Sequence, residues 1–240
     1  MKAQNKDKPM LSVVMPVYNE AEIIEGVVRN NYEKIIKKFP GSEFIICEDG
    51  STDGTREILA RIAKEIPIRL STGKEKKGYL RASRDALGLA SGKWVFFSDS
   101  DGQHDPADFW KLYEQREGFD LVIGSRVERN DPLFRKILSR GFNLIVSLMF
   151  GVRVRDFNAG FKLMKGEVAQ KVVPKIRHVK YGFSTELIVR TRRMGYKVIE
   201  VPVKHMERTS GEAAQFKPGR IPRVICEQMM GLLALRFERG

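Results

Sequence analysis

Short apolar runs alternate with amphipathic stretches along the first half of the chain. Runs of strand length, bounded by turn residues, cover residues 10–17, 43–47, 67–71, 93–97 and 120–123. Helical spacing of apolar positions covers residues 20–39, 56–66, 78–90 and 108–117, with Asn19 as the expected N-cap of the first helix. Strands that alternate with helices predict an α/β fold with a doubly wound, mostly parallel sheet flanked by helices.

Two apolar segments follow in the second half. Residues 142–150 are almost all apolar and have arginine and lysine on both sides, and residues 221–237 carry apolar side chains at helical spacing. Neither segment contains the roughly 20 consecutive apolar residues that span a bilayer. Two interpretations stay open: amphipathic helices that face the core, or helices that lie on an anionic lipid surface.

The chain of 240 residues is long enough for one elaborated α/β domain, which we place at residues 10–210. Residues 1–9 are polar, so they predict a flexible N-terminus and no secretory signal, and residues 211–240 predict a basic amphipathic C-terminal helix. The two cysteines, Cys47 and Cys226, form neither a metal motif nor a disulfide framework, which fits a reducing cytoplasm.

The net charge of +13 is distributed unevenly. Residues 1–125 carry a net charge of −1 and residues 126–240 carry +14. The basic half indicates an anionic partner, either phosphate groups, a membrane surface or nucleic acid. A nucleic-acid-binding domain is the remote alternative, because the chain shows no aromatic RNA-binding motif and no recognition-helix pattern.

Asp99 and Asp101 directly follow the apolar run at 93–97, one residue apart. Ligands of open α/β sheets bind at the carboxyl ends of the strands. Mg²⁺ or Mn²⁺ is commonly held by one or two carboxylates together with substrate phosphates. The pair therefore predicts a divalent-cation site at a strand end.

Three predicted strands end in polar loops that share one edge of a parallel sheet: residues 16–20, 48–55 and 99–103. Together they supply a tyrosine for stacking on a base, carboxylates for base or ribose hydrogen bonds, and the aspartate pair for a metal-bound diphosphate. The glycine-rich dinucleotide fingerprint and the P-loop motif are both missing from the sequence. The combination predicts a nucleoside-diphosphate ligand.

Five motifs in order carry a resemblance to a known family: Val14-Met15-Pro16-Val17-Tyr18-Asn19-Glu20, Glu48-Asp49-Gly50-Ser51-Thr52-Asp53-Gly54-Thr55, Asp99-Ser100-Asp101-Gly102-Gln103-His104-Asp105-Pro106, Val122-Ile123-Gly124-Ser125-Arg126 and Asp156-Phe157-Asn158-Ala159-Gly160-Phe161. The chain resembles family 2 glycosyltransferases of the GT-A fold. Within that family it is most similar to the dolichol- and polyprenyl-phosphate sugar synthases.

The resemblance implies a role for each matching residue. The nucleotide site would consist of Pro16, Tyr18, Glu20, Asp49, Ser51 and Asp99. The metal ligands would be Asp99, Asp101 and Gln103, and the catalytic set Asp99, Asp101, Arg126 and Arg208. The acceptor site would consist of Arg126, Arg135, Arg140 and Asp156. The chain departs from the family pattern at Asn158, where serine or threonine is usual, and at residues 212–214.

A phosphate monoester is nucleophilic at pH 7, because its second pKa is about 6, whereas a hydroxyl acceptor needs a general base. The second half offers many arginines and no obvious dedicated base. We therefore expect an inverting enzyme that moves a hexose from a GDP-mannose or UDP-glucose type donor to a polyprenyl or dolichyl phosphate, bound peripherally to the cytoplasmic face of a membrane. The alternative is a soluble or polymeric hydroxyl acceptor. The sequence selects neither the sugar nor the base.

Overall fold

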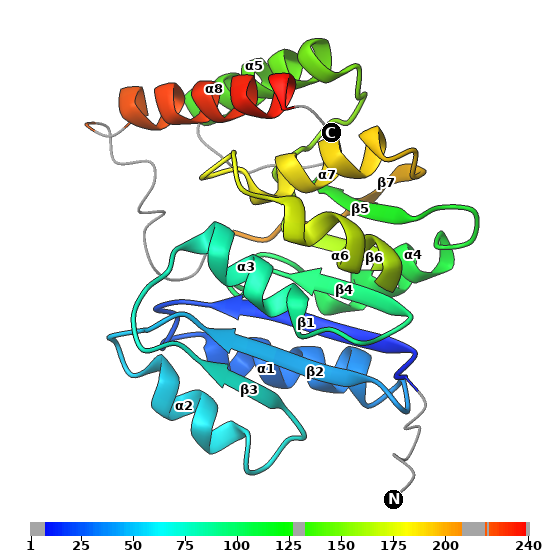
Figure 1. The fold of residues 1–240 in the computed structure, drawn as a ribbon. Coiled ribbons are helices and arrows are strands. Elements are labelled where there is room, and N and C mark those ends of the chain that lie inside the picture. The colour runs from blue at the N-terminus through cyan, green and yellow to red at the C-terminus, as the bar shows by residue number, and fades with distance from the viewer. Residues whose placement is uncertain (1–7, 127–132, 208–218, 220, 239–240) are drawn as a thin grey trace, which may run out of the picture.

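The computed structural model describes residues 8–126, 133–207, 219 and 221–238, without the side chains of Leu133 and Arg135 (Figure 1). Its centre is one seven-stranded sheet in the order β3-β2-β1-β4-β6-β5-β7. The strands are β1 (Leu11–Val17), β2 (Glu43–Glu48), β3 (Arg69–Thr72), β4 (Trp94–Ser98), β5 (Leu121–Arg126), β6 (Phe161–Lys165) and β7 (Val198–Val203). The mostly parallel α/β sheet expected from the sequence is confirmed.

The sheet departs from full parallel pairing at one strand. β6 runs antiparallel to both of its neighbours, β4 and β5. β6 and β7 lie outside the five strands expected from the apolar runs. The insertion of β6 carries the loop at 156–160 to the end of β4, where the backbone N–H of Asp99 donates to the carbonyl of Gly160 at 2.9 Å.

Helices cover both faces of the sheet. One face is covered by α1 (Ile24–Asn31), α2 (Thr55–Ile62) and α4 (Phe109–Glu114), and the other by α3 (Tyr79–Gly88), α5 (Leu133–Phe150), α6 (Gly166–Val172), α7 (Phe183–Arg193) and α8 (Ile221–Phe237). A five-residue π-helix, Tyr32–Ile36, extends α1, and two 3₁₀ turns lie at Pro106–Asp108 and Val173–Lys175.

The core consists of two clusters, one on each face of the sheet. Along β1, Val13 and Met15 belong to one cluster and Val14 to the other, since successive side chains of a strand point to opposite faces. All seven residues of β1 are buried. A central strand that is covered on both faces explains why residues 10–17 are apolar except for Ser12.

The predicted helix at 20–39 is corrected in one respect. Asn19 is not its N-cap: α1 begins at Ile24, with Ile23 as the capping residue and no side-chain cap. Asn19 has a φ of 52° and its side chain accepts a hydrogen bond from the backbone N–H of Thr52 at 2.9 Å. The residue therefore joins two loops, a use of asparagine in the left-handed region that competes with helix capping.

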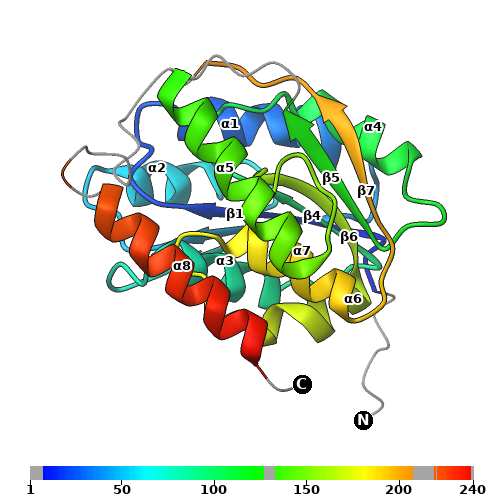
Figure 2. The ribbon, with the colours of Figure 1, turned by 90° about the horizontal axis from the view of Figure 1, so that it is seen from above.

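Helices α5 and α8 lie side by side at one end of the molecule, and in Figure 1 they lie above α7 (Figures 1 and 2). The interpretation that these helices face the core is confirmed for only some of their side chains. Val146 of α5 and Gly231, Leu232 and Leu235 of α8 are buried against the domain. Other large apolar side chains of the two helices are exposed: Phe134, Ile137, Leu138, Leu144, Ile145 and Leu148 on α5, and Ile225, Met230, Leu233 and Phe237 on α8. We call this set the α5–α8 face.

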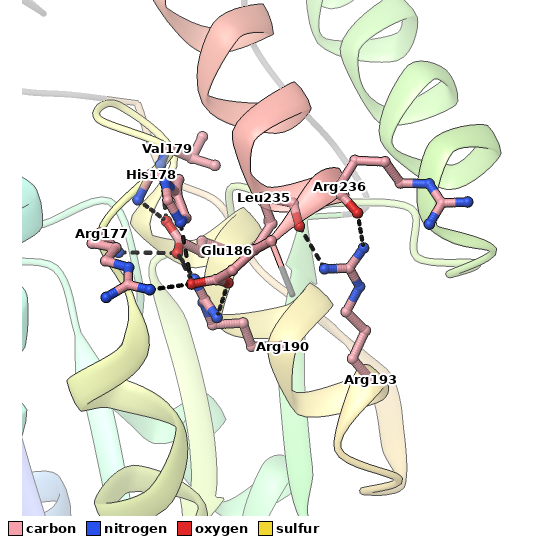
Figure 3. A network of polar contacts seen from close by, with 9 residues as sticks. Arg177, His178, Val179, Glu186, Arg190, Arg193, Leu235 and Arg236 are labelled. Carbon is pink, nitrogen blue, oxygen red and sulfur yellow. Dashed lines mark hydrogen bonds and ion pairs between the residues drawn. The ribbon is translucent and has the colours of Figure 1, made fainter. Parts of the chain in front are cut away.

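A polar network fixes the end of α8 to α7 (Figure 3). The buried carboxylate of Glu186 accepts backbone N–H bonds from Arg177, His178 and Val179 at 2.8–2.9 Å and pairs with Arg190. The other side of the Arg190 guanidinium pairs with Glu238 at 2.6 Å. These contacts tie α8 to the folded domain rather than leaving it as a separate tail.

The guanidinium of Arg193 also donates to the carbonyls of Leu235 and Arg236 at the last turn of α8 (Figure 3). Such a cation satisfies carbonyls that have no partner within the helix and interacts favourably with the helix dipole. No helix in the described ranges is long and apolar enough to cross a bilayer.

Candidate active site

The loops that follow β1, β2 and β4 meet at one edge of the sheet, as the sequence predicts, because these strands are parallel neighbours. We call residues 18–20, 48–55 and 99–103 the carboxylate edge. Pro16 lies one residue before the end of β1, paired with Cys47 of β2. The strand order thus brings three separate motifs together.

Hydrogen bonds join the first two loops of the carboxylate edge. The backbone N–H of Asn19 donates to Ser51 Oγ at 3.0 Å, and that of Glu20 donates to Thr55 Oγ1 at 2.9 Å. The N–H of Ala21 donates to Asp53 Oδ2 at 3.1 Å. Ser51 therefore shapes the loop through its side chain, and Asp53 supports the neighbouring loop beside the start of α2.

Asp49 is buried and its carboxylate is engaged by backbone donors. Oδ1 accepts from the N–H of Lys77 and Oδ2 from the N–H of Gly78, each at 2.9 Å. Both donors immediately precede α3, which begins at Tyr79. The role expected for Asp49 at a nucleobase therefore coincides with a role in holding the start of α3.

The aromatic ring of Tyr18, in the loop that follows β1, contacts a lysine of the segment before α3. The Nζ atom of Lys76 lies 3.7 Å from the ring centroid, which is cation–π distance. A base that stacks on this face of Tyr18 would take the place of the ammonium group. Lysine at this position was not identified from the sequence.

Asp99 is held in a close-fitting environment at the end of β4. The Tyr79 hydroxyl donates to its Oδ1 at 2.8 Å. A Cβ on Gly160 would lie only 1.6 Å from its Oδ2, so glycine is required there. Burial, together with the neighbouring Asp101 carboxylate, raises the pKa of Asp99 to about 6.

The Asp101 carboxylate is more accessible from solvent than that of Asp99. Its side chain is half-buried, and Oδ1 accepts the backbone N–H of Gln103 at 3.1 Å. The Gln103 side chain donates to the carbonyl of Met206 at 3.3 Å, and a bridge pairs His104 with His205. Gln103 therefore also anchors the segment that follows β7.

Arg126, the last residue of β5, pairs with Asp156 in the loop before β6. The guanidinium donates two bonds to the carboxylate, Nε to Oδ2 at 2.6 Å and Nη2 to Oδ1 at 2.9 Å. Their side chains are 15% and 5% exposed, which makes this a largely buried bidentate pair. Glu200 of β7 fixes the loop by accepting the backbone N–H groups of Arg155 and Asp156.

Lys162 is fully buried and lies near the carboxylates of Asp99 and Asp156. Its Nζ donates to the carbonyl of Ala159 and, at 2.7 Å, to Ser184 Oγ. Burial lowers the pKa of Lys162 to about 8, and the nearby Asp99 and Asp156 oppose that shift. A positive charge held here offsets part of the negative charge that the carboxylates bring together.

The remaining expected acceptor residues are less defined. Arg140 lies on α5 and is exposed. Arg208, and the side chain of Arg135, lie outside the described residues. The structure therefore brings together the nucleotide and metal candidates and the Arg126–Asp156 pair, and it does not bring Arg140 into that group.

The donor set fits a hard divalent cation that shares its coordination with a ligand. Within the described ranges, no group of three or more histidine, cysteine, aspartate or glutamate side chains could hold a metal alone. Asp101 offers one open carboxylate beside the more enclosed Asp99. One or two carboxylates completed by substrate phosphates is a common arrangement for Mg²⁺.

Three residues of the site were missed by sequence reasoning: Tyr79, Lys76 and Lys162. Lys162 follows directly after the motif at 156–161, so extending that motif by one residue would have included it. Lys76 and Tyr79 flank the Lys77-Gly78 step before α3, which matched none of the five motifs. No local signal ties a residue at that position to Asp99, because the contact depends on how α3 packs.

Comparison with known proteins shows which sequences this chain is similar to. The family described as "Glycosyl transferase family 2" matches residues 12–173, which include the carboxylate edge and the 156–161 motif. An undecaprenyl-phosphate mannosyltransferase of Micrococcus luteus is 28% identical over 235 residues, covering 94% of this chain and 95% of the relative.

Solved structures share the fold. Glucosyl-3-phosphoglycerate synthase from Mycobacterium tuberculosis, in complex with Mn²⁺, UDP and phosphoglyceric acid, has a TM-score of 0.72 at 20% identity, covering 98% of this chain and 80% of that one. A mannosyltransferase from Pyrobaculum calidifontis, in complex with GDP-mannose and Mn²⁺, has a TM-score of 0.65 at 21% identity, covering 98% and 66%.

Proposed function

This chain belongs to glycosyl transferase family 2 and is a glycosyltransferase, and from that premise we propose that it transfers a hexose, with inversion, from a nucleotide-diphosphate sugar to a polyprenyl phosphate at a membrane surface. The donor half of the proposal rests on the carboxylate edge. The acceptor half rests on the Arg126–Asp156 pair and on the α5–α8 face.

The carboxylate edge provides what a nucleotide sugar requires. Tyr18 offers a ring for the base, Asp49 and Ser51 lie in the loop next to it, and Asp99 and Asp101 lie at the end of the adjacent strand β4. Because these loops are already joined by hydrogen bonds, little ordering is left to be done when the donor binds. The proposal does not choose between uracil and guanine.

Mg²⁺ or Mn²⁺ is the cofactor that we propose for this edge, with Asp101, Asp99 and Gln103 as its candidate ligands. The relative from Mycobacterium tuberculosis and that from Pyrobaculum calidifontis were both solved with Mn²⁺ and a nucleotide. When bound, such a cation neutralises negative charge that grows on the departing diphosphate.

Arg126 is the candidate group for the acceptor phosphate. Its guanidinium is oriented by Asp156, and Asp156 is oriented in turn by Glu200. A phosphate monoester is already nucleophilic at pH 7, so the protein's task is to align it and to balance its charge. An oriented guanidinium fork performs both tasks. Arg208 and Arg135 stay proposed contributors.

The α5–α8 face is the observation that supports a lipid as the acceptor. Leu148 and Phe237 are 76% and 78% exposed, far more than a buried helix face allows. Basic side chains on the same helices include Arg140, Arg223 and Arg236. Apolar side chains flanked by arginine and lysine are typical of helices that lie in the interface of an anionic bilayer. We therefore propose peripheral attachment to the cytoplasmic face.

The test is a transfer assay with defined components. The protein is incubated with Mn²⁺ and GDP-mannose or UDP-glucose, and with one of three acceptors: undecaprenyl phosphate in vesicles, 3-phosphoglycerate, or a free sugar. Product is measured by mass spectrometry. We expect a glycosylated lipid phosphate with one of the two donors, and co-sedimentation with vesicles that contain anionic lipid.

Transfer to 3-phosphoglycerate or to a free sugar, with no lipid product and no vesicle binding, would overturn the acceptor half and leave the donor half intact. That alternative has its own support, because the fold relative from Mycobacterium tuberculosis was solved with phosphoglyceric acid. Absence of metal-dependent nucleotide binding would overturn the whole proposal.

A further inference from the structure

Residues 77–79 contact two carboxylates that follow different strands. The backbone N–H groups of Lys77 and Gly78 donate to Asp49, which follows β2. One residue later the side chain of Tyr79 donates to Asp99, which follows β4. Three consecutive residues thus touch both the base side and the metal side of the carboxylate edge, with β1 lying between the two strands.

The position of the Tyr79 ring is itself fixed. The ring packs edge-on against Phe183 of α7 at a centroid distance of 6.3 Å and an interplanar angle of 89°. Phe183 is fully buried and contacts Phe97 of β4.

Asp99 has little freedom to find another position. Even a Cβ on Gly160 would collide with its Oδ2, and the Tyr79 hydroxyl donates to its Oδ1. Its backbone N–H is held by the carbonyl of Gly160. Removing the phenolic hydroxyl would take away the hydrogen bond that Oδ1 of Asp99 accepts.

Gly78 allows the segment to make both contacts. Its φ of +91° lies in the region that favours glycine, and this turn places the N–H of residue 78 on Asp49 while α3 begins at the next residue. The two contacts are therefore linked through a short, geometrically determined piece of chain.

We propose that residues 77–79 are a positioning segment that sets the separation of Asp49 and Asp99, with Tyr79 as the positioning residue for the metal-side carboxylate. This inference rests on the proposed donor site. It predicts that loss of the Tyr79 hydroxyl weakens binding of the metal–nucleotide complex and leaves acceptor binding unchanged.

The experiment compares Tyr79→Phe with the wild-type protein and with Tyr113→Phe. Tyr113 lies on α4, on the other face of the sheet, and its ring packs against Phe109 and Phe39. Binding of GDP and of UDP is measured by calorimetry at several Mn²⁺ concentrations. In the transfer assay, KM for the donor, KM for the acceptor and kcat are determined separately.

We expect Tyr79→Phe to raise the dissociation constant of the nucleotide, the half-saturating Mn²⁺ concentration and the donor KM about ten-fold each, the effect of losing one hydrogen bond to a charged group. The acceptor KM should stay within about two-fold of wild type, and Tyr113→Phe should match wild type in every measurement. A merely structural role would instead change thermal stability and all kinetic constants together.

A second variant makes the linkage itself testable. Asp49→Asn replaces one of the two acceptor oxygens that hold Lys77 and Gly78 with an NH₂ group. If residues 77–79 link the two sites, the effects of Asp49→Asn and Tyr79→Phe on nucleotide affinity are not additive in the double variant. Independent sites would give additive effects, and that result would overturn the proposed linkage.

The failures of the two proposals are distinguishable. Nucleotide binding that Tyr79→Phe leaves unchanged would overturn this inference and leave the donor site standing. Weaker binding by Tyr79→Phe, without transfer to lipid phosphate by the wild-type protein, would support the inference and overturn the proposed acceptor. If the wild-type protein bound neither nucleotide with Mn²⁺, both would be overturned.

Discussion

The carboxylate edge and the α5–α8 face are built in opposite ways. At the carboxylate edge, polar side chains are held by backbone N–H groups and hydroxyls from loops distant in sequence, as with Asp49 and Asp99. The α5–α8 face instead presents apolar side chains that the described part of the chain leaves exposed. Rigid placement suits a small ligand of fixed shape, whereas an exposed apolar surface suits a fluid and variable partner.

Between these regions lies the Arg126–Asp156 pair. It belongs to β5 and to the loop before β6, and thus to the part of the sheet that connects the carboxylate edge with the helices above it. In the proposed reaction the sugar passes from one region to the other at this place. Substitutions in the three regions should therefore have different consequences for donor binding, transfer and membrane binding.

The largest expected effect is at Asp101. Asp101→Asn keeps the size of the side chain and removes its charge, so the candidate metal loses its most open carboxylate. We expect transfer to fall about a thousand-fold, because electrostatic stabilisation of a leaving group is worth several kcal/mol. Steady-state kinetics at saturating Mn²⁺ measures this. Asp105→Asn, in the same loop but paired with Lys34, is the control.

Gly160→Ala should have the next largest effect. The new methyl group would collide with Asp99 Oδ2 and displace the carboxylate or the loop at 156–160. We expect at least a hundred-fold weaker nucleotide binding, with a loss of about 2 kcal/mol in stability. Gly88→Ala in α3 is the matched control, because its added Cβ meets nothing within 4 Å. Equal behaviour of the two variants would contradict the close fit around Asp99.

Arg126→Lys tests the Arg126–Asp156 pair, which lies between the carboxylate edge and the α5–α8 face. Lysine keeps the charge but cannot form the two parallel bonds to Asp156, so phosphate alignment suffers more than nucleotide binding. We expect kcat to fall about thirty-fold with the nucleotide dissociation constant within two-fold of wild type. Calorimetry and transfer kinetics on the same preparation separate these quantities. A parallel loss of nucleotide affinity would place Arg126 on the donor side.

The sequence predicted the carboxylate edge well, because each motif lies at the end of its own strand. Asp99 and Asp101 follow β4 directly, and the order β2-β1-β4 then brings their loops together. What the sequence did not reveal depends on pairing over long distances. The antiparallel β6 places Gly160 and Lys162 beside Asp99, and α3 places Tyr79 there.

The predicted N-cap at Asn19 was wrong, also because long-range contacts cannot be deduced from a local pattern. Asn19 precedes an amphipathic stretch and fits an N-cap, yet the neighbouring loop at 51–55 offers it partners that a single helix cannot. The helix therefore begins later, at Ile24. Tertiary hydrogen bonds outweighed a capping preference worth about 1 kcal/mol.

Aspartate on the α5–α8 face should affect only membrane-dependent activity. Leu148→Asp with Phe237→Asp places two charges on exposed positions, so the free energy of unfolding should change by less than about 1 kcal/mol. Vesicle binding should weaken about ten-fold or more, because apolar burial and anionic attraction both decline. Met10→Asp, immediately before β1, is the control for an exposed apolar residue elsewhere.

In that experiment, nucleotide binding serves as the internal reference. The double variant should bind GDP or UDP as the wild type does, while transfer to lipid phosphate in vesicles falls. If vesicle binding stayed unchanged, the α5–α8 face would not be the membrane contact, although the carboxylate edge would be unaffected.

The smallest expected effect concerns how α8 is held. Burial raises the pKa of Glu238, but the bonds from Arg190, Arg177 and His178 more than reverse this and lower it to about 2. A carboxylate whose pKa is lower in the folded state contributes stability above its unfolded pKa of about 4.5, and this contribution is lost as the pH falls from about 4.5 to 2. Glu238→Gln should therefore destabilise the protein by about 1 kcal/mol at pH 7 and by progressively less below pH 4.5.

Urea unfolding between pH 3 and 7 measures this difference. Glu167→Gln, which breaks only an exposed pair with Lys171, should show almost none of it. Because Glu238 directly follows α8, Glu238→Gln should also weaken vesicle binding slightly while leaving nucleotide affinity at its wild-type value. A difference in stability that persisted at pH 3 would show that Glu238 acts through packing and not through its charge.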